Sequence, residues 1–175
     1  MIRIISSTNR PGAVSYKVAK HYQVLLTDLG VESEIIDLAN LPDDFIASAL
    51  YQNSGKNEAF NPIREKMRDT EKYVFIVPEY NGSFPGILKT FIDGLEFPTT
   101  FTGKKAALVG LGAGVQGAVL AMSHLTDIFN YCGTNVLAQK PKLAGIGKAM
   151  NDAGEITNEL YLNLLRDQAK AFVAF

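Results

Sequence analysis

Residues 73–86 of the chain read YVFIVPEYNGSFPG. The first five letters form an uninterrupted apolar run, which is typical of a strand covered on both faces of a parallel sheet. The next nine include two prolines, two glycines, an acid, a tyrosine and an amide, and the helical pattern ILKTFIDGL follows directly. A buried strand that ends in a stiff polar loop before a helix indicates a binding loop at the edge of an α/β sheet.

Strand and helix patterns alternate on both sides of this stretch. Apolar runs predict further strands at residues 2–6, 32–37 and 106–111, and a weaker one at residues 134–138. Helical patterns cover residues 61–70, 87–95 and 117–131, and a C-terminal helix places Tyr161, Leu165 and Phe172 on one face. Right-handed crossovers return the chain to the same sheet, so the pattern predicts a five-stranded parallel sheet between two layers of helices.

The first helix is predicted from an apolar stripe. Val18, Tyr22, Leu25 and Leu29 recur at spacings of four, three and four, and Gly30 ends the pattern. Residues 40–60 have no clear period, and we expect them to form a surface excursion.

Length and composition narrow the class of protein. The 175 residues fit the range of roughly 100 to 200 for one domain, so we expect a single domain over residues 1–175. With 17 basic and 18 acidic residues, no strong field is present to recruit nucleic acid or an anionic membrane. Residues 106–122 carry no charge, but four glycines interrupt them, so we expect no membrane span. The lone cysteine, Cys132, and the absence of a signal-peptide pattern favour the cytoplasm.

The loop after the first strand reads SSTNRPGAVSYK at residues 6–17 and leads into the first helix. Its hydroxyls, the guanidinium of Arg10 and the amides of a helix N-terminus together suit a bound phosphate. A helix cap at Ser15 with a Pro11-Gly12 turn explains the same residues without a ligand. The lysine of a nucleotide-triphosphate P-loop is missing at the required spacing, so triphosphate hydrolysis has little support.

The loop after the fourth strand contains Gly112, Gly114 and Gly117 in the spacing of a dinucleotide fingerprint. That fingerprint normally includes an acid about 20 residues further on, and residues 134–141 contain none. We therefore interpret the glycines as letting a flat ligand approach the backbone, with tight packing of helix on strand as the alternative.

The first loop together with PEYNGSFPGILKTFID resembles the NADPH-dependent FMN reductase family, whose members include quinone, azo-dye and chromate reductases. The match holds position by position in P-E-Y-N, P-G, L-K and the acid at Asp93. Over nearly all the rest of the chain, the resemblance lies in the order of strands and helices. The resemblance implies an α/β, flavodoxin-like fold, a three-layer doubly wound sandwich. It also implies that Thr8, Arg10 and Ser15 hold the FMN phosphate. The flavin ring would be framed by Pro78, Glu79, Tyr80, Asn81, Gly82, Ser83, Gly112 and Gly114.

The first loop departs from the family pattern at Ser7, where glycine is frequent, and at Ala13 and Ser15, where serine and asparagine are frequent. These changes remove potential phosphate donors, and Arg10 and the backbone amides are left to compensate.

As an enzyme of this family the protein would pass a hydride from NADPH or NADH to FMN and then to a small electron acceptor such as a quinone, azo compound or free flavin. Because a flavin supplies this chemistry, no catalytic side chain is expected. His21 and His124 are isolated, so we expect no metal site.

Two alternatives remain open. A flavodoxin-type electron carrier would dock to protein partners, but such carriers present a strongly acidic face and this chain has a net charge of −1. An NAD-binding protein built on the glycine loop is the third possibility. The resemblance further implies a homodimer or homotetramer, and the apolar residues Phe97, Pro98 and Phe101 are candidates for the contact.

Overall fold

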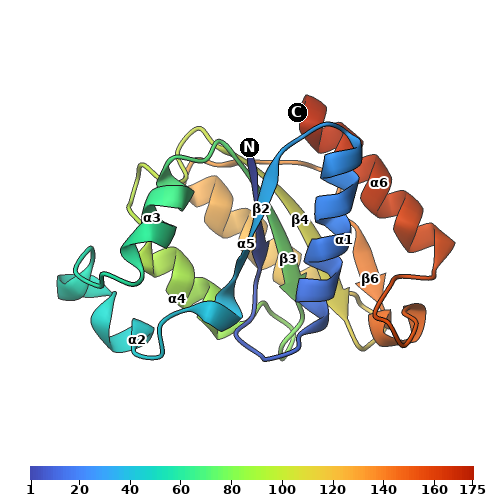
Figure 1. Ribbon diagram of the computed structural model, residues 1–175, viewed down its shortest axis with the longest axis horizontal. Coiled ribbons are helices and arrows are strands. Elements are labelled where there is room, and N and C mark those ends of the chain that lie inside the picture. Colours follow the sequence, from blue (N-terminus) through green and yellow to red (C-terminus); the bar gives the residue numbers. More distant parts are fainter.

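The computed structural model describes all residues, 1–175, and is built around one parallel sheet (Figure 1). Its strands are β1 Ile2–Ser6, β2 Ser33–Asp37, β3 Lys72–Pro78, β4 Lys105–Gly112, β5 Asn135–Val136 and β6 Lys142–Ala144. The strand order is β2-β1-β3-β4-β5, with β6 also paired to β4. This is the order of flavodoxin-like sheets, and the direction of winding reverses between β1 and β3. The predicted fold class is confirmed.

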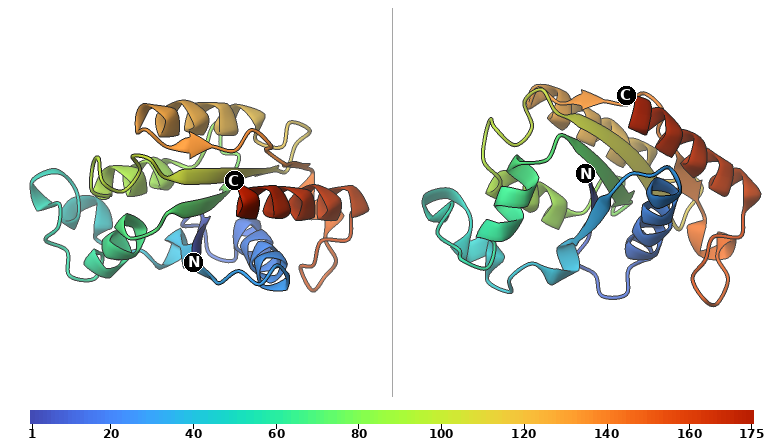
Figure 2. Two further views of the ribbon diagram at one scale, coloured as in Figure 1. Left: turned by 90° about the horizontal axis from the view of Figure 1, so that it is seen from above. Right: turned by 45° about the horizontal axis from the view of Figure 1, so that its top comes forward.

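Two layers of helices cover the sheet. Helices α1 Val14–Asp28 and α6 Glu159–Ala174 pack on one face, and α3 Asn61–Arg68, α4 Gly86–Gly94 and α5 Val119–Tyr131 pack on the other. The left view of Figure 2 shows α5 and α1 on opposite sides of the strands. Along β3, Tyr73, Phe75 and Val77 enter the core beneath α4 and α5, whereas Val74 and Ile76 enter the core beneath α1 and α6. Burial on both sides explains the unbroken apolar run.

The fifth strand differs from the prediction over residues 134–138. Only Asn135–Val136 pair with the start of β4, and the unpredicted strand β6 pairs with its end. The chain leaves the sheet edge between them, and a buried side chain fills the gap. Gln168 of α6 donates from Nε2 to the carbonyl oxygens of Leu108 and Gln139, both at 2.9 Å.

The apolar stripe of α1 also needs correction. Val18 and Tyr22 are fully buried as predicted, but Leu29 lies beyond the helix end and is exposed. Leu26 is buried in its place, because the helix turns about 100° per residue and positions 15, 18, 19, 22 and 26 face the sheet.

Residues 40–60, which the sequence predicts to be a surface excursion, are anchored in the core by buried aromatic side chains. The short helices of this part of the chain are η1 Leu38–Asn40, α2 Phe45–Ser48 and η2 Tyr51–Asn53. Phe45 and Phe60 are buried, with ring centroids 4.6 Å apart, and both rings press on Gly94 of α4. One further short helix, η3 Ile146–Ala149, follows β6. None of the helices combines the length and apolarity needed to cross a lipid bilayer.

Candidate functional site

The carboxyl ends of the strands lie along the lower edge of the view in Figure 1, where the loops after β1, β3 and β4 meet. Open α/β sheets bind ligands at this edge, beside the point where the winding reverses. A cavity of about 330 Å³ lies here. It is lined by Thr8, Arg10, Pro11, Gly12, Ala13, Val14, Ser15, Pro78, Glu79, Tyr80, Leu111, Gly112, Ala113, Ile146 and Gly147.

The first loop presents the start of α1 to this cavity. No side chain caps the helix at its N-cap residue, Ala13, and its first turn contains no acid. The Ser15 hydroxyl lies 3.3 Å from that of Ser6 in the interior, so the capping role considered from the sequence is not observed. Free amides and the positive end of the helix dipole therefore face the cavity, which suits an anion.

The hydroxyls of this loop divide into two groups. Ser7 donates to the carbonyl oxygen of Ile5 at 3.2 Å, so its side chain is turned back onto the strand. Thr8, which is buried, lies 2.9 Å from the Tyr80 hydroxyl and accepts the Arg10 amide at 3.3 Å. Of Ser7 and Thr8, Thr8 is the one that lines the cavity.

The loop after β3 contains a tight two-residue turn. Asn81 and Gly82 both have positive φ, at 52° and 75°, and Tyr80 and Ser83 exchange two backbone hydrogen bonds of 2.8 and 3.0 Å. This is a type I′ turn, for which Asn-Gly is a preferred pair. The Asn-Gly pair at residues 81–82 is the sequence signal for both positive φ values.

Glu79 has a structural partner. Its Oε2 atom accepts the backbone N–H of Ala118, the first residue before α5, at 2.8 Å. A Cβ on Gly112 would come within 3.3 Å of the same carboxylate oxygen. The acid therefore joins the loop after β3 to the loop after β4, and Arg10 and Glu79 are the only charged side chains that line the cavity.

The glycines at the end of β4 and in the loop after it differ in their surroundings. A Cβ on Gly110 would lie 2.6 Å from the Gly117 carbonyl oxygen, and one on Gly117 would lie 3.1 Å from the Ala144 amide, so these two permit tight packing. Gly112 lines the cavity. Gly114 has open space around it. The dinucleotide spacing therefore arises partly from packing needs.

The structure brings together seven of the eleven residues expected at the site: Thr8, Arg10, Ser15, Pro78, Glu79, Tyr80 and Gly112. Asn81, Gly82, Ser83 and Gly114 do not line the cavity. Ile146 and Gly147 form a wall that the sequence did not predict, because they follow the unpredicted strand β6. The Ser83 hydroxyl instead meets Nδ1 of His124 on α5, at 2.9 Å.

These groups fit a phosphorylated flavin better than a metal ion. Uncapped helix amides, a guanidinium and a buried hydroxyl are donors for a phosphate, and Gly12 and Gly112 leave space where a side chain would intrude. No group of three or more His, Cys, Asp or Glu side chains is placed to hold a metal ion.

Known proteins with related sequences and structures agree with this fit. The chain is 29% identical over 176 residues to an NAD(P)H-dependent FMN reductase of Pseudomonas aeruginosa, covering 95% of this chain and 90% of that one. It is 28% identical over 147 residues to a 2-hydroxy-1,4-benzoquinone reductase of a Burkholderia species, covering 80% and 78%. Among solved structures, FerB, a flavoenzyme NAD(P)H:(acceptor) oxidoreductase from Paracoccus denitrificans, superposes with a TM-score of 0.79 at 26% identity, covering 99% and 94%.

The family model described as NADPH-dependent FMN reductase matches residues 1–145, which include β1 to β6 and every residue that lines the cavity except Ile146 and Gly147. The chain therefore belongs to the NADPH-dependent FMN reductase family and is an oxidoreductase.

Proposed function

We propose that the cavity holds FMN through its phosphate and that the protein transfers electrons from NADPH or NADH to a small acceptor. The observation that carries this proposal is the uncapped N-terminus of α1, which faces a cavity shared with Arg10 and Thr8. A helix N-terminus beside a guanidinium and a buried hydroxyl is a site for a phosphate group.

The chain's own residues bind and orient the flavin in this proposal. FMN, when bound, accepts a hydride from the nicotinamide and passes two electrons to the acceptor. Thr8, Arg10, Ser15 and the α1 amides would hold the phosphate. The ring would lie against the stretch from Pro78 to Ser83, including Glu79, Tyr80, Asn81 and Gly82, and against Gly112 and Gly114. The type I′ turn supports this placement because it fixes the backbone of that stretch in one conformation.

For the acceptor we propose a quinone. Two kinds of support exist: relatives of this chain are named as reductases of quinones, and a cavity on the surface of a nearly neutral protein is accessible to small uncharged molecules. An electron carrier that docks to proteins has less support, because the family model is that of a reductase and the net charge is −1.

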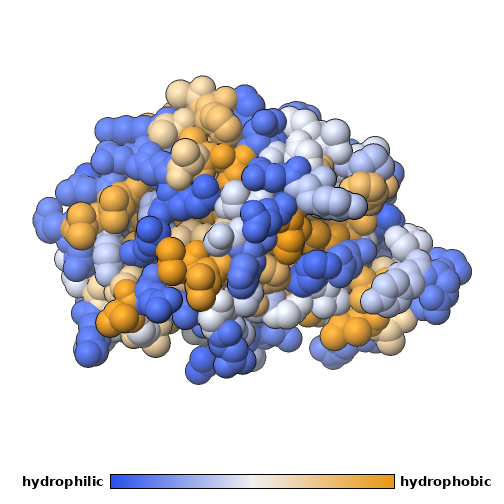
Figure 3. All heavy atoms as spheres, turned by 180° about the vertical axis from the view of Figure 1, so that it is seen from behind, coloured by the Kyte–Doolittle hydropathy of each residue, from blue (hydrophilic) through white to orange (hydrophobic).

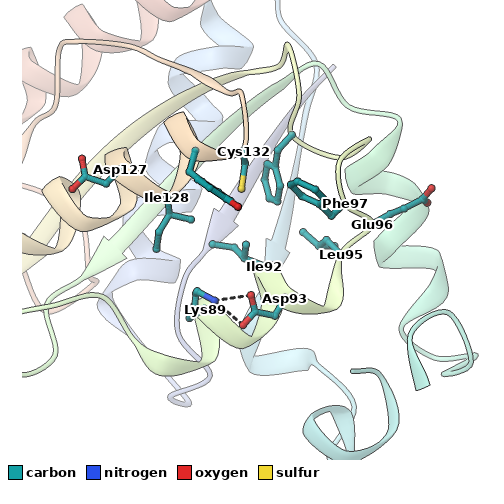
Figure 4. Close-up of a pocket in the computed structure, with 11 residues that line it drawn as sticks. Lys89, Ile92, Asp93, Leu95, Glu96, Phe97, Asp127, Ile128 and Cys132 are labelled. Atoms are coloured by element: carbon teal, nitrogen blue, oxygen red, sulfur yellow. Dashed lines mark hydrogen bonds and ion pairs between the residues drawn. The ribbon is translucent and has the colours of Figure 1, made fainter. Parts of the chain in front are cut away.

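We further propose that two copies associate through the outer surfaces of α4 and α5, to give a homodimer or a larger homo-oligomer. A hollow of about 550 Å³ lies there, between Ile92 on α4 and Ile128 on α5 (Figure 4). Phe97 and Tyr131 line it with 68% and 86% of their surfaces exposed. Phe101, expected at this surface, also lines the hollow, although it is only 3% exposed and packs in the core. Figure 3, the view from behind, shows hydrophobic residues interspersed with hydrophilic ones.

Most of the charges around the hollow are paired within one copy. Lys89 pairs with Asp93 at 2.7 Å, and Glu96 lies 3.9 Å from Arg68, so Asp127 is the unpaired charge that a twofold partner would have to accommodate. Burial raises the pKa of the Cys132 thiol, which favours the protonated form of this lining residue. Tyr131→Glu should shift the species seen by light scattering toward monomer, whereas a wild-type monomer at micromolar concentration would exclude the assembly.

The remaining proposals concern organisation and location. We propose that residues 1–175 act as a single FMN-binding domain in the cytoplasm. One sheet that joins all six strands supports the single domain, and a lone free cysteine, which can form no disulfide within the chain, supports the location.

Absorbance spectroscopy tests the proposed function. The purified protein, mixed with FMN, should show a protein-bound flavin spectrum that bleaches on anaerobic addition of NADPH or NADH and recovers on addition of a quinone. A protein that leaves the FMN spectrum and fluorescence unchanged would contradict the binding proposal. One that binds FMN without bleaching would contradict the nicotinamide step and favour the electron carrier.

A further inference from the structure

The Thr8 and Tyr80 side chains meet at the cavity although they come from different loops. Thr8 follows β1 and Tyr80 follows β3, yet the Thr8 Oγ1 atom lies 2.9 Å from the Tyr80 Oη atom. Thr8 is 1% exposed, and both residues line the cavity. The contact therefore links the loop proposed to hold the phosphate with the loop proposed to frame the ring.

The hydrogen bonds of Thr8 show what this contact can do. A hydroxyl has one hydrogen to donate and two lone pairs to accept with. The Arg10 amide donates to Thr8 Oγ1 at 3.3 Å and occupies one lone pair. If the Tyr80 hydroxyl donates to the other, the single hydrogen of Thr8 is left for a ligand in the cavity.

A bound phosphate would fix the direction of the bond between the two hydroxyls. An ionised phosphate only accepts hydrogen bonds, so Thr8 must donate to it. Thr8 must then accept from Tyr80. We infer that Tyr80 is a positioning residue, which donates to the Thr8 hydroxyl and thereby directs the Thr8 hydrogen toward the phosphate of FMN.

This inference rests on the proposed function, because it concerns how the same cavity recognises FMN. It differs from a simple ring contact between Tyr80 and the flavin. A ring contact would contribute equally to FMN and to riboflavin, which lacks the phosphate. A relay through Thr8 contributes to FMN alone, since riboflavin has no phosphate to accept the Thr8 hydrogen.

Flavin fluorescence titrations of the flavin-free, full-length protein test the relay. Tyr80→Phe keeps the ring and removes the hydroxyl. We expect its Kd for FMN to rise about three- to tenfold, the range for loss of one neutral hydrogen bond. Its Kd for riboflavin should not change. Tyr51→Phe is the matched control: Tyr51 is exposed, and both dissociation constants should equal those of the wild type.

A double-mutant cycle adds the second readout. Thr8→Val removes the acceptor of the Tyr80 bond, so Tyr80→Phe should cause no further loss of FMN affinity in that background. In Thr8→Ser, which keeps a hydroxyl, the response to Tyr80→Phe should persist.

Equal losses for FMN and riboflavin in Tyr80→Phe, or losses that simply add in the double variant, would overturn the positioning role. So would an unchanged FMN affinity in Tyr80→Phe. Each of these results leaves the proposed function intact, whereas a wild-type protein with no affinity for FMN would remove the proposed function itself.

Discussion

The Glu79 carboxylate caps helix α5, since its Oε2 atom accepts the Ala118 amide at 2.8 Å. Ala118 has a positive φ of 66°, a conformation that a residue with a Cβ adopts at some cost. The hydrogen bond from Glu79 holds it there and places a negative group at the positive end of the helix dipole. An acid that the sequence offers as a flavin contact thus also fixes the position of a neighbouring helix.

We expect Glu79→Ala to lower the free energy of unfolding by about 1 kcal/mol, the typical cost of losing a helix cap. Glu79→Gln should lower the free energy of unfolding by less, because the amide oxygen can still accept a hydrogen bond from the Ala118 N–H. Urea denaturation followed by circular dichroism measures both. Glu58→Ala is the control, because Glu58 is exposed and makes no ion pair. Equal stability of Glu79→Ala and the wild type would show that the carboxylate does not cap α5.

Two buried tyrosines should respond in opposite ways to loss of the hydroxyl. The Tyr73 hydroxyl has the carbonyl oxygens of Met67, Thr70 and Thr100 within 2.6 to 3.0 Å. The Tyr22 hydroxyl is equally buried and has no partner. Tyr73→Phe should therefore lower the free energy of unfolding by about 1 to 2 kcal/mol, and Tyr22→Phe should raise it by about 1 kcal/mol.

Thermal and urea unfolding of these two variants provide a matched comparison, since each removes one oxygen atom from the core. A loss of stability in Tyr22→Phe as large as that in Tyr73→Phe would mean that the Tyr22 hydroxyl has a partner, such as a buried water.

The glycines of β4 and of the loop after it should differ in how well they tolerate a side chain. Gly110→Ala would place a Cβ 2.6 Å from the backbone oxygen of Gly117, and backbone atoms cannot rotate away as a side-chain tip can. We expect the free energy of unfolding to fall by about 3 kcal/mol or more. A Cβ on Gly114 would have no atom within 4 Å, so the free energy of unfolding of Gly114→Ala should stay within about 0.5 kcal/mol of the wild-type value. Chemical denaturation measures both, and a tolerated Gly110→Ala would contradict the packing interpretation.

Short-range sequence patterns explain which parts of the fold and of the site could be predicted from the sequence. The strand β3 was predicted because burial on both faces demands a continuous apolar run, and the loop after it because proline, glycine and amide residues restrict the backbone. Strand β6 was missed because three residues, KLA, have no period to detect. Ile146 and Gly147 were not predicted to line the cavity for the same reason, because their position depends on where β6 ends. The Thr8 to Tyr80 contact spans 72 positions, and only the folded sheet brings such residues together.

Gln168 should be essential to the interrupted edge of the sheet. Its Nε2 atom satisfies two carbonyl oxygens, on Leu108 and Gln139, that the broken fifth strand leaves without backbone partners. Gln168→Met has a similar size but no donor, so the buried Leu108 carbonyl and the partly buried Gln139 carbonyl would lose this partner. We expect the free energy of unfolding of this variant to fall by about 2 to 4 kcal/mol. Hydrogen exchange should show faster exchange in α6 and β4, and an unchanged unfolding midpoint would contradict the role of this side chain.

Arg10 should contribute to FMN affinity through its charge, in a way that salt can reveal. It is exposed and lines the cavity beside the amides of α1, so its attraction to a phosphate is open to screening. We expect Arg10→Gln to raise the Kd for FMN about tenfold at low salt and to leave the Kd for riboflavin unchanged. In about 1 M salt, where the Debye length falls to roughly 3 Å, the difference between variant and wild type should shrink. Lys56→Gln changes the net charge equally at an exposed position that does not line the cavity, and should alter neither constant. A loss of riboflavin affinity as large as that of FMN would place Arg10 against the ring or ribityl chain and leave the α1 amides and Thr8 as the phosphate donors.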